Sequence, residues 1–423
     1  MTLPRRELLK SLTGMAASVA FTKLDVGRAF DATRLSSVGL PRKQDFDLTD
    51  GYTYLNAAYT HPIPRPAADA ARAYLAQRNK LAMPRPGSGG GAGEGFNAKA
   101  LFAELINAKP SEIAYVPNTS TGENFVVGAL GLDRPTDANV VTDWLHFDGA
   151  LVHLLELKRG GLDVRIVRPT SDYRIDIDDL ARVIDRKTRL VELSSTTMYN
   201  GFQHDLKAVC ERAHSHGAYV YADIIHTAGA EPFDVKASGV DFAACSSFKW
   251  LMADYGLGFL YARDDLLERI RRPLVGYYQA ASMTSHEPPF DHAGESEPVA
   301  WTFSRDATGH FEAGSIGGAL NAGLGASLAY IKEVGVANIQ AYRKPMVQKL
   351  RDEVPRHGFT CVTPRHSTAS IITFARKGLA ASDIPAKLAR ARVSVRVADN
   401  WMRVSPSIYN DMADIERLLE ALT

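Results

Sequence analysis

Cysteine is scarce in this chain of 423 residues, and its three cysteines, Cys210, Cys245 and Cys361, form no CxxC pair. This scarcity predicts neither a disulfide framework nor a structural zinc, and we expect no metal site. Cys361 is expected to be a small buried hydrophobe. No apolar run reaches the roughly eighteen residues that a membrane-spanning helix needs. A GKS or GKT phosphate-binding motif is also missing, which argues against a P-loop.

An excess of charge of either sign is missing too. The net charge is +1, with 45% hydrophobic and 23% charged residues, a composition typical of a soluble globular protein. Nothing in it indicates nucleic-acid binding. The chain exceeds the length at which a single core usually stops growing, so two domains are expected.

The N-terminus differs from the rest of the chain. It reads MTLPRRELLK and then SLTGMAASVAF, a basic segment with Arg5 and Arg6 followed by a short, weakly apolar one. This pattern resembles a twin-arginine export signal, with possible cleavage near Ala20 or Ala29. We therefore expect residues 1–35 to be signal peptide and linker, and the protein to be periplasmic or exported. The alternative is an N-terminal amphipathic helix on a cytoplasmic protein.

Apolar segments alternate with helical patterns through the middle of the chain. A helix is expected over 63–80, with proline near its start. The glycine-rich segment 85–96 is not preceded by a strand, so it does not indicate a dinucleotide site. Beyond it, short strands such as IAYV, RLVELSS, AYVYAD and GFLYA alternate with amphipathic helices. This alternation predicts an α/β fold with a mostly parallel sheet covered on both faces.

The C-terminal third has a different pattern. A long helix near 317–355, broken at Gly335, is followed by TASIITFA, VSVRV, WMRVS and a final helix. These elements predict a smaller α+β unit. The expected organisation is a segment 36–62 associated with the small domain, a large domain over 63–315 and a small domain over 316–423.

Asp223 and Lys249 each follow an apolar strand, and ligands of such sheets bind beyond the carboxyl ends of the strands. The neighbours of Lys249, CSSF and WLM, are too apolar for a surface segment, and burial lowers a lysine pKa toward what imine formation needs. A carboxylate and a lysine placed in this way can hold the two poles of a pyridoxal phosphate (PLP) ring. Taken singly, the two residues are equally well a helix cap and a surface charge.

A phosphate site is indicated by PNTSTGENFVVGAL, residues 117–130. Thr119, Ser120 and Thr121 supply hydroxyl groups at the start of an apolar helix, where backbone amides and the helix dipole favour an anion. An ordinary helix cap would give the same pattern.

From about residue 52 to the C-terminus, the chain resembles the class V aminotransferase family of fold-type I PLP enzymes, which includes cysteine desulfurases, kynureninases and isopenicillin N epimerases. The resemblance implies a seven-stranded sheet, PLP as the cofactor and a homodimer with active sites at the interface. The segments that carry it, in chain order, are YTYLNAAYTHPIPR, NTSTGENFVVGAL, LHFDGALVHL, YADIIHTAGAEPFDV, CSSFKW, HFEAGSIGGALNAGLGASLAYI and MRVSPSIYN.

The resemblance assigns roles to individual residues. Lys249 is the Schiff-base lysine and proton carrier, and Asp223 is the partner of the ring nitrogen. Phe147, or His146 beside it, stacks on the ring. Arg403 grips the substrate carboxylate, with help from Asn56. The further cofactor ligands are His226 at the 3′-oxygen, Thr119, Ser120 and Ser246 at the phosphate, and Ser315 at the phosphate of the neighbouring subunit.

The departures narrow the chemistry. Cysteine desulfurases carry a catalytic cysteine on a loop ahead of the carboxylate arginine, whereas ARVSVRVADNWMRVS contains none, so a cysteine-persulfide mechanism is not expected. Phe248 replaces the tyrosine of kynureninases, and Met198 occupies a commonly polar position. Both changes argue against a standard kynureninase.

The expected function is PLP-dependent chemistry at Cα of an amino acid or peptide-like amine. Epimerisation, side-chain elimination and transamination are all open, including tailoring of secondary metabolites such as siderophore peptides. One alternative is a cytoplasmic carbon–sulfur lyase of the same family. Another is a catalytically silent PLP-fold binding protein, against which the retention of Lys249 and Asp223 counts.

Overall fold

The computed structural model describes residues 39–80, 97–285 and 297–423. The predicted export signal and the glycine-rich segment 85–96 lie outside these residues, so export and location stay predictions. Within the described ranges, no helix has both the length and the apolar character needed to cross a bilayer.

A seven-stranded sheet forms the centre of the molecule, in the order β2-β8-β7-β6-β5-β3-β4. Only β8 runs against its neighbours β2 and β7, so the predicted mostly parallel sheet is confirmed. Its strands are β2 (Ile113–Val116), β3 (Asn139–Asp143), β4 (Asp163–Val167), β5 (Thr188–Ser194), β6 (Tyr219–Asp223), β7 (Phe242–Ser246) and β8 (Gly258–Ala262).

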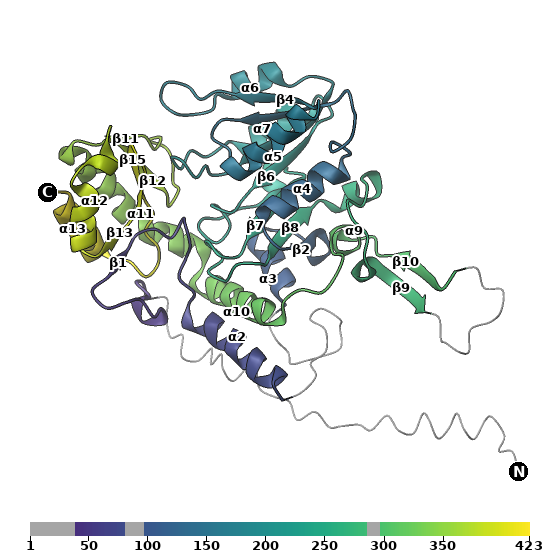
Figure 1. Cartoon of the computed structure of the whole chain (residues 1–423), viewed down its shortest axis with the longest axis horizontal. Coiled ribbons are helices and arrows are strands. Elements are labelled where there is room, and N and C mark those ends of the chain that lie inside the picture. Colours follow the sequence, from purple (N-terminus) through teal and green to yellow (C-terminus); the bar gives the residue numbers. More distant parts are fainter. Residues whose placement is uncertain (1–38, 81–96, 286–296) are drawn as a thin grey trace, which may run out of the picture.

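Helices cover both faces of this sheet, as Figure 1 shows. Residues of alternating parity along each strand enter two separate cores, because successive side chains point to opposite faces. One face packs against α3 (Ala98–Leu105), α6 (Ile177–Val183), α7 (Leu206–His214) and α10 (Gly318–Val334). The other face packs against α4 (Thr119–Ala129), α5 (Asp148–Arg159) and α9 (Ala307–Phe311).

Two glycines mark helix ends that the sequence predicts. Gly335 has φ +82° and separates α10 from α11 (Val336–Glu353), which confirms the break. Gly217 has φ +81° in the turn between α7 and β6. Both values lie in the left-handed region that glycine adopts without a steric penalty. α2 (Arg65–Arg78) begins with Pro66 in its first turn and packs along α10.

The C-terminal part has its own sheet, in the order β11-β12-β15-β14, with α12 (Ile384–Arg390) and α13 (Met412–Leu422) packed near it. β1 (Thr53–Tyr54) pairs in parallel with β13 (Val393–Ser394), which joins the N-terminal segment to this part. The predicted domain limits stay predictions. The strands of the sheet are β11 (Thr360–Cys361), β12 (Ile372–Ala375), β14 (Arg396–Val397) and β15 (Trp401–Val404).

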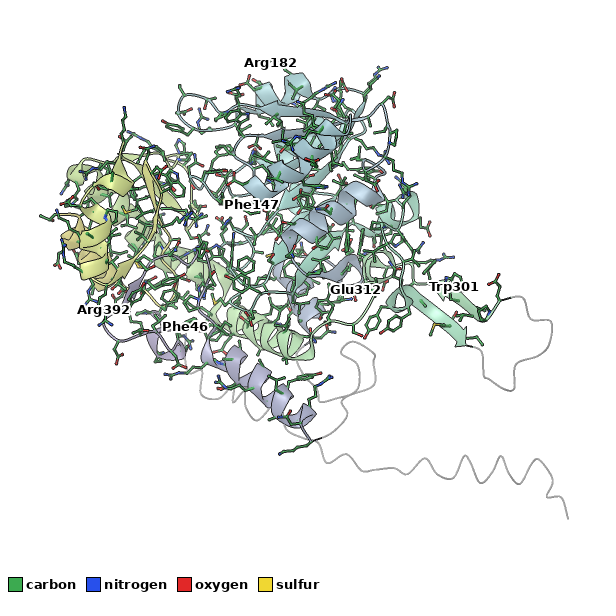
Figure 2. The ribbon with its side chains drawn as sticks, in the orientation of Figure 1. Phe46, Phe147, Arg182, Trp301, Glu312 and Arg392 are labelled. Carbon is green, nitrogen blue, oxygen red and sulfur yellow. The ribbon has the colours of Figure 1, made fainter. Side chains whose placement is uncertain are left out.

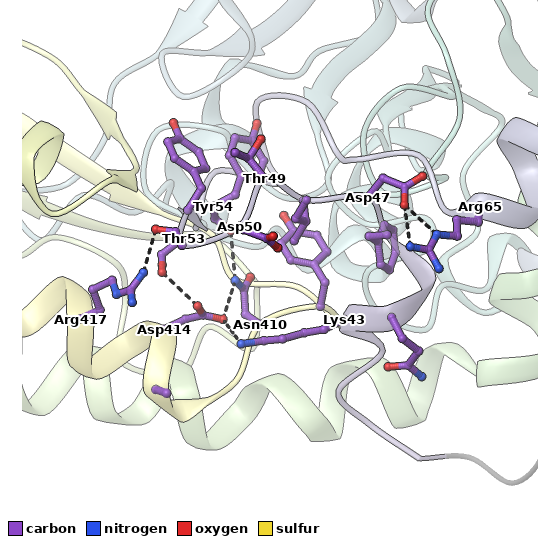
Figure 3. A pocket seen from close by; sticks show the side chains of 17 residues that line it. Lys43, Asp47, Thr49, Asp50, Thr53, Tyr54, Arg65, Asn410, Asp414 and Arg417 are labelled. Atoms are coloured by element: carbon purple, nitrogen blue, oxygen red, sulfur yellow. Dashed lines mark hydrogen bonds and ion pairs between the residues drawn. The ribbon is translucent and has the colours of Figure 1, made fainter.

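The N-terminal segment is also fastened to α13 by side chains, which Figure 3 shows lining a groove of about 680 Å³. Lys43 Nζ lies 2.7 Å from a carboxylate oxygen of Asp411 and 3.1 Å from one of Asp414. The Thr53 hydroxyl donates to Asp414 at 3.0 Å, and Arg417 donates to the Gly51 carbonyl at 2.9 Å. These bonds tie residues 43–53 to the last helix.

One element was not predicted. The antiparallel pair β9 (Ala280–Ser285) and β10 (Val299–Phe303) extends away from the body of the molecule in Figure 1. Its side chains are mostly exposed, including Met283 and Trp301. Since neither face is buried against the core, the sequence lacks the apolar alternation by which strands are recognised.

Candidate active site

A cavity of about 180 Å³ lies at the carboxyl ends of β5, β6 and β7, the edge predicted from the positions of Asp223 and Lys249. It brings together residues from three strand ends and two helix starts that are distant in sequence. The lining residues are Asn118, Thr119, Ser120, Phe147, Ser194, Met198, Asp223, Ile225, His226, Ser246, Phe248 and Lys249.

The Lys249 side chain lines this cavity. Its Nζ lies 3.1 Å from Nε2 of His226 and 5.9 Å from the ring centroid of Phe147. Burial lowers the pKa of Lys249 to about 8, an effect that the positive charge of Arg403 reinforces and the nearby Asp223 opposes. An appreciable fraction of the amine is therefore neutral near physiological pH, as a nucleophile or base requires.

Asp223 is the last residue of β6, and one of its carboxylate oxygens accepts the Ile225 backbone N–H at 2.9 Å. Burial raises the pKa of this carboxyl, against the opposing effects of His146, the Ile225 N–H and Lys249. A buried carboxylate stays ionised when a cation lies against it. A protonated pyridine nitrogen meets this requirement, so Asp223 fits the PLP ring.

His226 lines the cavity in its neutral form. Burial lowers its pKa well below the usual value, and the charges of Lys249 and Arg403 act in the same direction. Its Nδ1 is buried and has no hydrogen-bond partner. An orphaned polar atom of this kind is satisfied by a ligand group, and the 3′-oxygen of PLP is a suitable one.

The start of α4 meets the end of β7 at the opposite side of the cavity. The Thr119 N–H donates to the Ser246 hydroxyl at 2.8 Å, and the Ser246 N–H donates to the Thr119 hydroxyl at 3.0 Å. The Asn118 side chain caps the helix by accepting the Thr121 N–H at 2.8 Å. Ser120 completes a hydroxyl-lined helix N-terminus that can hold a phosphate.

The structure separates the two aromatic candidates for ring stacking. Phe147, labelled in Figure 2, precedes α5 and lines the cavity. His146 is wholly buried behind it, with Nδ1 2.8 Å from the Ser194 hydroxyl, and is not among the lining residues. Of the two, only Phe147 presents a ring to the cavity.

Arg403 and Asn56 lie deeper, outside the set of lining residues. Arg403 is buried on β15 and donates to the Met198 carbonyl at 2.9 Å, while its Nε has no partner. Burial lowers its pKa to about 10. The Asn56 side-chain oxygen is likewise buried and unpartnered, and Asn56 bridges to Ser405, two residues past Arg403. Met198 itself lines the cavity, so the Arg403 guanidinium contacts a lining residue without lining the cavity itself.

Ser315 lies outside this cavity. It is exposed, and its hydroxyl is 3.1 Å from the hydroxyl of Tyr277. Sequence reasoning missed three lining residues, Asn118, Ser194 and Ile225. Each of the three lies at a strand end or helix start, next to a residue or motif that the sequence had identified. That adjacency is the signal by which they could have been found.

None of the three cysteines lines the cavity. Cys245 is buried on β7, and burial raises its pKa well above the usual value. Cys361 is only partly buried, contrary to expectation, because β11 is an edge strand; its sulfur lies 3.9 Å from Arg351. The structure thus offers no activated thiol next to Lys249.

The fold and the cavity together define a fold-type I PLP-dependent enzyme. The family model for class-V aminotransferases matches residues 53–418, so the chain belongs to the aminotransferase class-V family, and its cofactor is PLP.

The similar proteins are named as enzymes that act on carbon–sulfur compounds. A probable cysteine desulfurase from Methanothermobacter thermautotrophicus is 28% identical over 78% of this chain and 80% of its own length. The apo structure of a cysteine desulfurase from Thermococcus onnurineus superimposes with a TM-score of 0.78 at 22% identity, covering 91% of this chain and 97% of that one. A cystine C–S lyase in complex with cysteine persulfide gives 0.72 at 21% identity, covering 88% and 97%.

Proposed function

We propose that the protein is a PLP-dependent carbon–sulfur lyase that cleaves the Cβ–S bond of an amino acid such as cysteine or cystine without using a cysteine of its own. The sequence leaves epimerisation, side-chain elimination and transamination open and offers a carbon–sulfur lyase as an alternative. The comparisons support that alternative better, because the relatives are named as cysteine desulfurases. The observation that carries the proposal is a buried Lys249, with a lowered pKa, in a cavity that no cysteine lines.

The residues divide into those that hold the cofactor and those that act on the substrate. Thr119, Ser120 and Ser246 would hold the phosphate, while Phe147, His226 and Asp223 would hold the ring. Bound PLP supplies an electron sink for the bond that breaks at Cα. Arg403 would bind the substrate carboxylate, since its unpartnered Nε needs an acceptor.

Lys249 would act as the base that takes the Cα proton. The electron pair of the Cα–H bond then forms a Cα=Cβ double bond, and the Cβ–S pair leaves with sulfur. From cysteine the leaving group is sulfide, and from cystine it is a persulfide; hydrolysis of the remaining carbon skeleton gives pyruvate and ammonia. Each step balances without an enzyme thiol or an external reductant.

The test measures pyruvate and released sulfur from L-cysteine and L-cystine with the PLP-loaded enzyme. Lys249→Ala should lower turnover at least about 10³-fold, since it removes the base, and should remove the cofactor absorbance near about 400–430 nm. Cys361→Ser is the matched control and should retain full activity.

Three outcomes would contradict this function. Loss of sulfur release in Cys361→Ser would establish a persulfide-carrying cysteine. Racemisation at Cα without pyruvate would favour an epimerase. Cofactor absorbance without turnover of either substrate would favour the silent binding protein.

A homodimer belongs to the same proposal. Ser315 is exposed and does not line the cavity of its own chain, and the family resemblance gives it a role at the phosphate of a neighbouring subunit. A sedimentation measurement of the solution mass tests this, and a monomer that retains full activity would contradict it.

A further inference from the structure

A second polar cluster lies behind the cofactor cavity, on the face of the sheet that α4 and α5 cover. Glu123 comes from α4, His146 from the turn between β3 and α5, and Glu192 from β5. All three side chains are buried, and their ligand-type atoms lie within 4.8 Å of one another. His146 Nε2 and Glu192 Oε1 are 3.5 Å apart.

The cluster is not satisfied by the protein alone. Both carboxylate oxygens of Glu192 and Nε2 of His146 lack a hydrogen-bond partner, although both residues are fully buried. The hydroxyl of Tyr221, paired with Glu192 across β5 and β6, is also buried and unpartnered. Each such group costs about 1–3 kcal/mol if left unmet. Four such groups lie together, and a bound cation would satisfy the carboxylate oxygens of Glu192 and Nε2 of His146.

The charge of the cluster leads to the same conclusion. Burial raises the pKa of Glu123 to about 8, and the neighbouring Glu192 raises it further, against the hydrogen bond from His153. Burial also raises the pKa of Glu192 to about 8, against a hydrogen bond shared with Glu123, so a proton between these two carboxyls is the alternative to a cation. Two buried carboxylates therefore need a proton or a cation between them. A single proton can satisfy one acceptor at a time, whereas a cation can contact all three ligand residues at once.

The histidine is already prepared as a ligand. Its Nδ1 lies 2.8 Å from the Ser194 hydroxyl, and this bond orients the ring with Nε2 toward Glu192. A histidine that binds a metal usually makes such a hydrogen bond through its other ring nitrogen. Nitrogen and oxygen ligands lie about 2.0–2.2 Å from a divalent transition metal, so the 3.5 Å between His146 Nε2 and Glu192 Oε1 suits one.

We propose that Glu123, His146 and Glu192 bind one divalent transition-metal ion, such as zinc or manganese, behind the cofactor cavity. One imidazole and two carboxylates make a mixed donor set that suits these ions better than calcium or magnesium, which prefer oxygen ligands. The sequence predicts no metal site because the ligands are far apart along the chain and follow no spacing rule.

The site adjoins the cofactor cavity. Ser194, which bonds His146, lines that cavity and pairs in register with Asp223. The ion would thus lie next to Asp223, the residue that would face the PLP ring. It would neutralise the carboxylates of Glu123 and Glu192. The proposal does not depend on the reaction that the enzyme catalyses.

The test is the metal content of the PLP-loaded protein, purified without a histidine tag and dialysed against metal-free buffer. We expect elemental analysis by mass spectrometry to find about one equivalent of one transition metal per chain. Glu192→Gln should lower this content at least tenfold. Glu231→Gln is the matched control, because Glu231 is a buried glutamate bonded to Thr196 and Gln203, outside the cluster; its metal content should be unchanged.

A second measurement avoids relying on a variant that fails to fold. Wild-type protein is unfolded with denaturant in the presence of a chelator and then refolded with PLP and either ZnCl2, MnCl2 or no metal. We expect one of the metals to raise Tm by several degrees. Less than a tenth of an equivalent in the native protein, together with no uptake on refolding, would overturn the proposal and favour a shared proton. Unchanged metal content in Glu192→Gln would overturn it as well. Neither readout uses lyase activity, so its failure is distinguishable from failure of the proposed function.

Discussion

Two hollows among the described residues, the groove beside α13 and the cavity at Lys249, differ in size and in whether their charged and polar groups have partners. The groove beside α13 measures about 680 Å³, and the cavity at Lys249 about 180 Å³. Burial lowers the pKa of Lys43 in the groove, but the hydrogen bonds and charges of Asp411 and Asp414 outweigh burial, so the pKa is raised. Burial lowers the pKa of Lys249 to about 8 in the cavity. The larger hollow contains paired charges that hold the N-terminal segment against α13. The smaller one contains buried polar groups that a bound ligand would satisfy.

The basic side chains of the groove therefore have partners, whereas some buried polar atoms of the site residues do not. In the groove, each of Lys43, Arg65 and Arg417 bonds an oxygen of the same chain, as Figure 3 shows. His226 Nδ1 at the cavity is buried without a partner, as is Nε of Arg403, which contacts the lining residue Met198. A ligand gains binding energy from satisfying such groups, because the desolvation cost is already part of the folded protein. Substitutions in the two regions should accordingly have different kinds of effect.

Asp223→Asn should have the largest effect among these substitutions. The amide keeps the shape of the side chain but removes the charge that holds a proton on the ring nitrogen. We expect kcat to fall about 10²–10³-fold, the usual loss when one preorganised electrostatic group is removed. Steady-state pyruvate release measures it, with bound PLP quantified separately. Full activity in Asp223→Asn would show that the ring nitrogen has another partner.

Arg403→Gln should affect substrate binding more than chemistry. A hydrogen bond to a charged group contributes about 1.5–3 kcal/mol, so KM should rise about 10–100-fold with a smaller change in kcat. The comparison of L-cysteine with its amide, which lacks the carboxylate, provides the control. If Arg403→Gln weakens both substrates equally, the guanidinium does not bind the carboxylate.

The pH dependence of cofactor binding should reveal the lowered pKa of Lys249. Only the neutral amine attacks PLP, so the recombination rate of the apoenzyme should rise about tenfold per pH unit below about 8 and then level off. N-acetyl-lysine is the reference amine, and its rate should keep rising to about pH 10. Coincident profiles for the two amines would mean that burial does not tune Lys249.

Asp414→Ala should have the smallest effect and a different one. It removes the acceptor for Thr53, one partner of Lys43 and the capping contact with Asp411. We expect a loss of about 1–2 kcal/mol in the free energy of unfolding, with kcat and KM unchanged. Chemical denaturation measures the loss. An altered KM would show that the groove communicates with the cavity.

Much of this architecture could be predicted from local pattern. The strands of the large sheet, the break at Gly335 and the edge on which Asp223 and Lys249 lie follow from apolar periodicity and glycine positions. The hairpin β9–β10 could not be predicted, because its exposed side chains carry no burial pattern. The partial exposure of Cys361 was missed because only the sheet order makes β11 an edge strand.

The sequence by itself determined the fold class, the cofactor and the chemical groups available to it, since these depend on residue types at strand ends and helix starts. Tertiary structure decided what depends on proximity. It decided that Phe147 and not His146 faces the cavity, that Lys249 is buried enough to lower its pKa, and that Glu123, His146 and Glu192 meet. Residues distant along the chain acquire a shared electrostatic environment only when packing excludes water from between them.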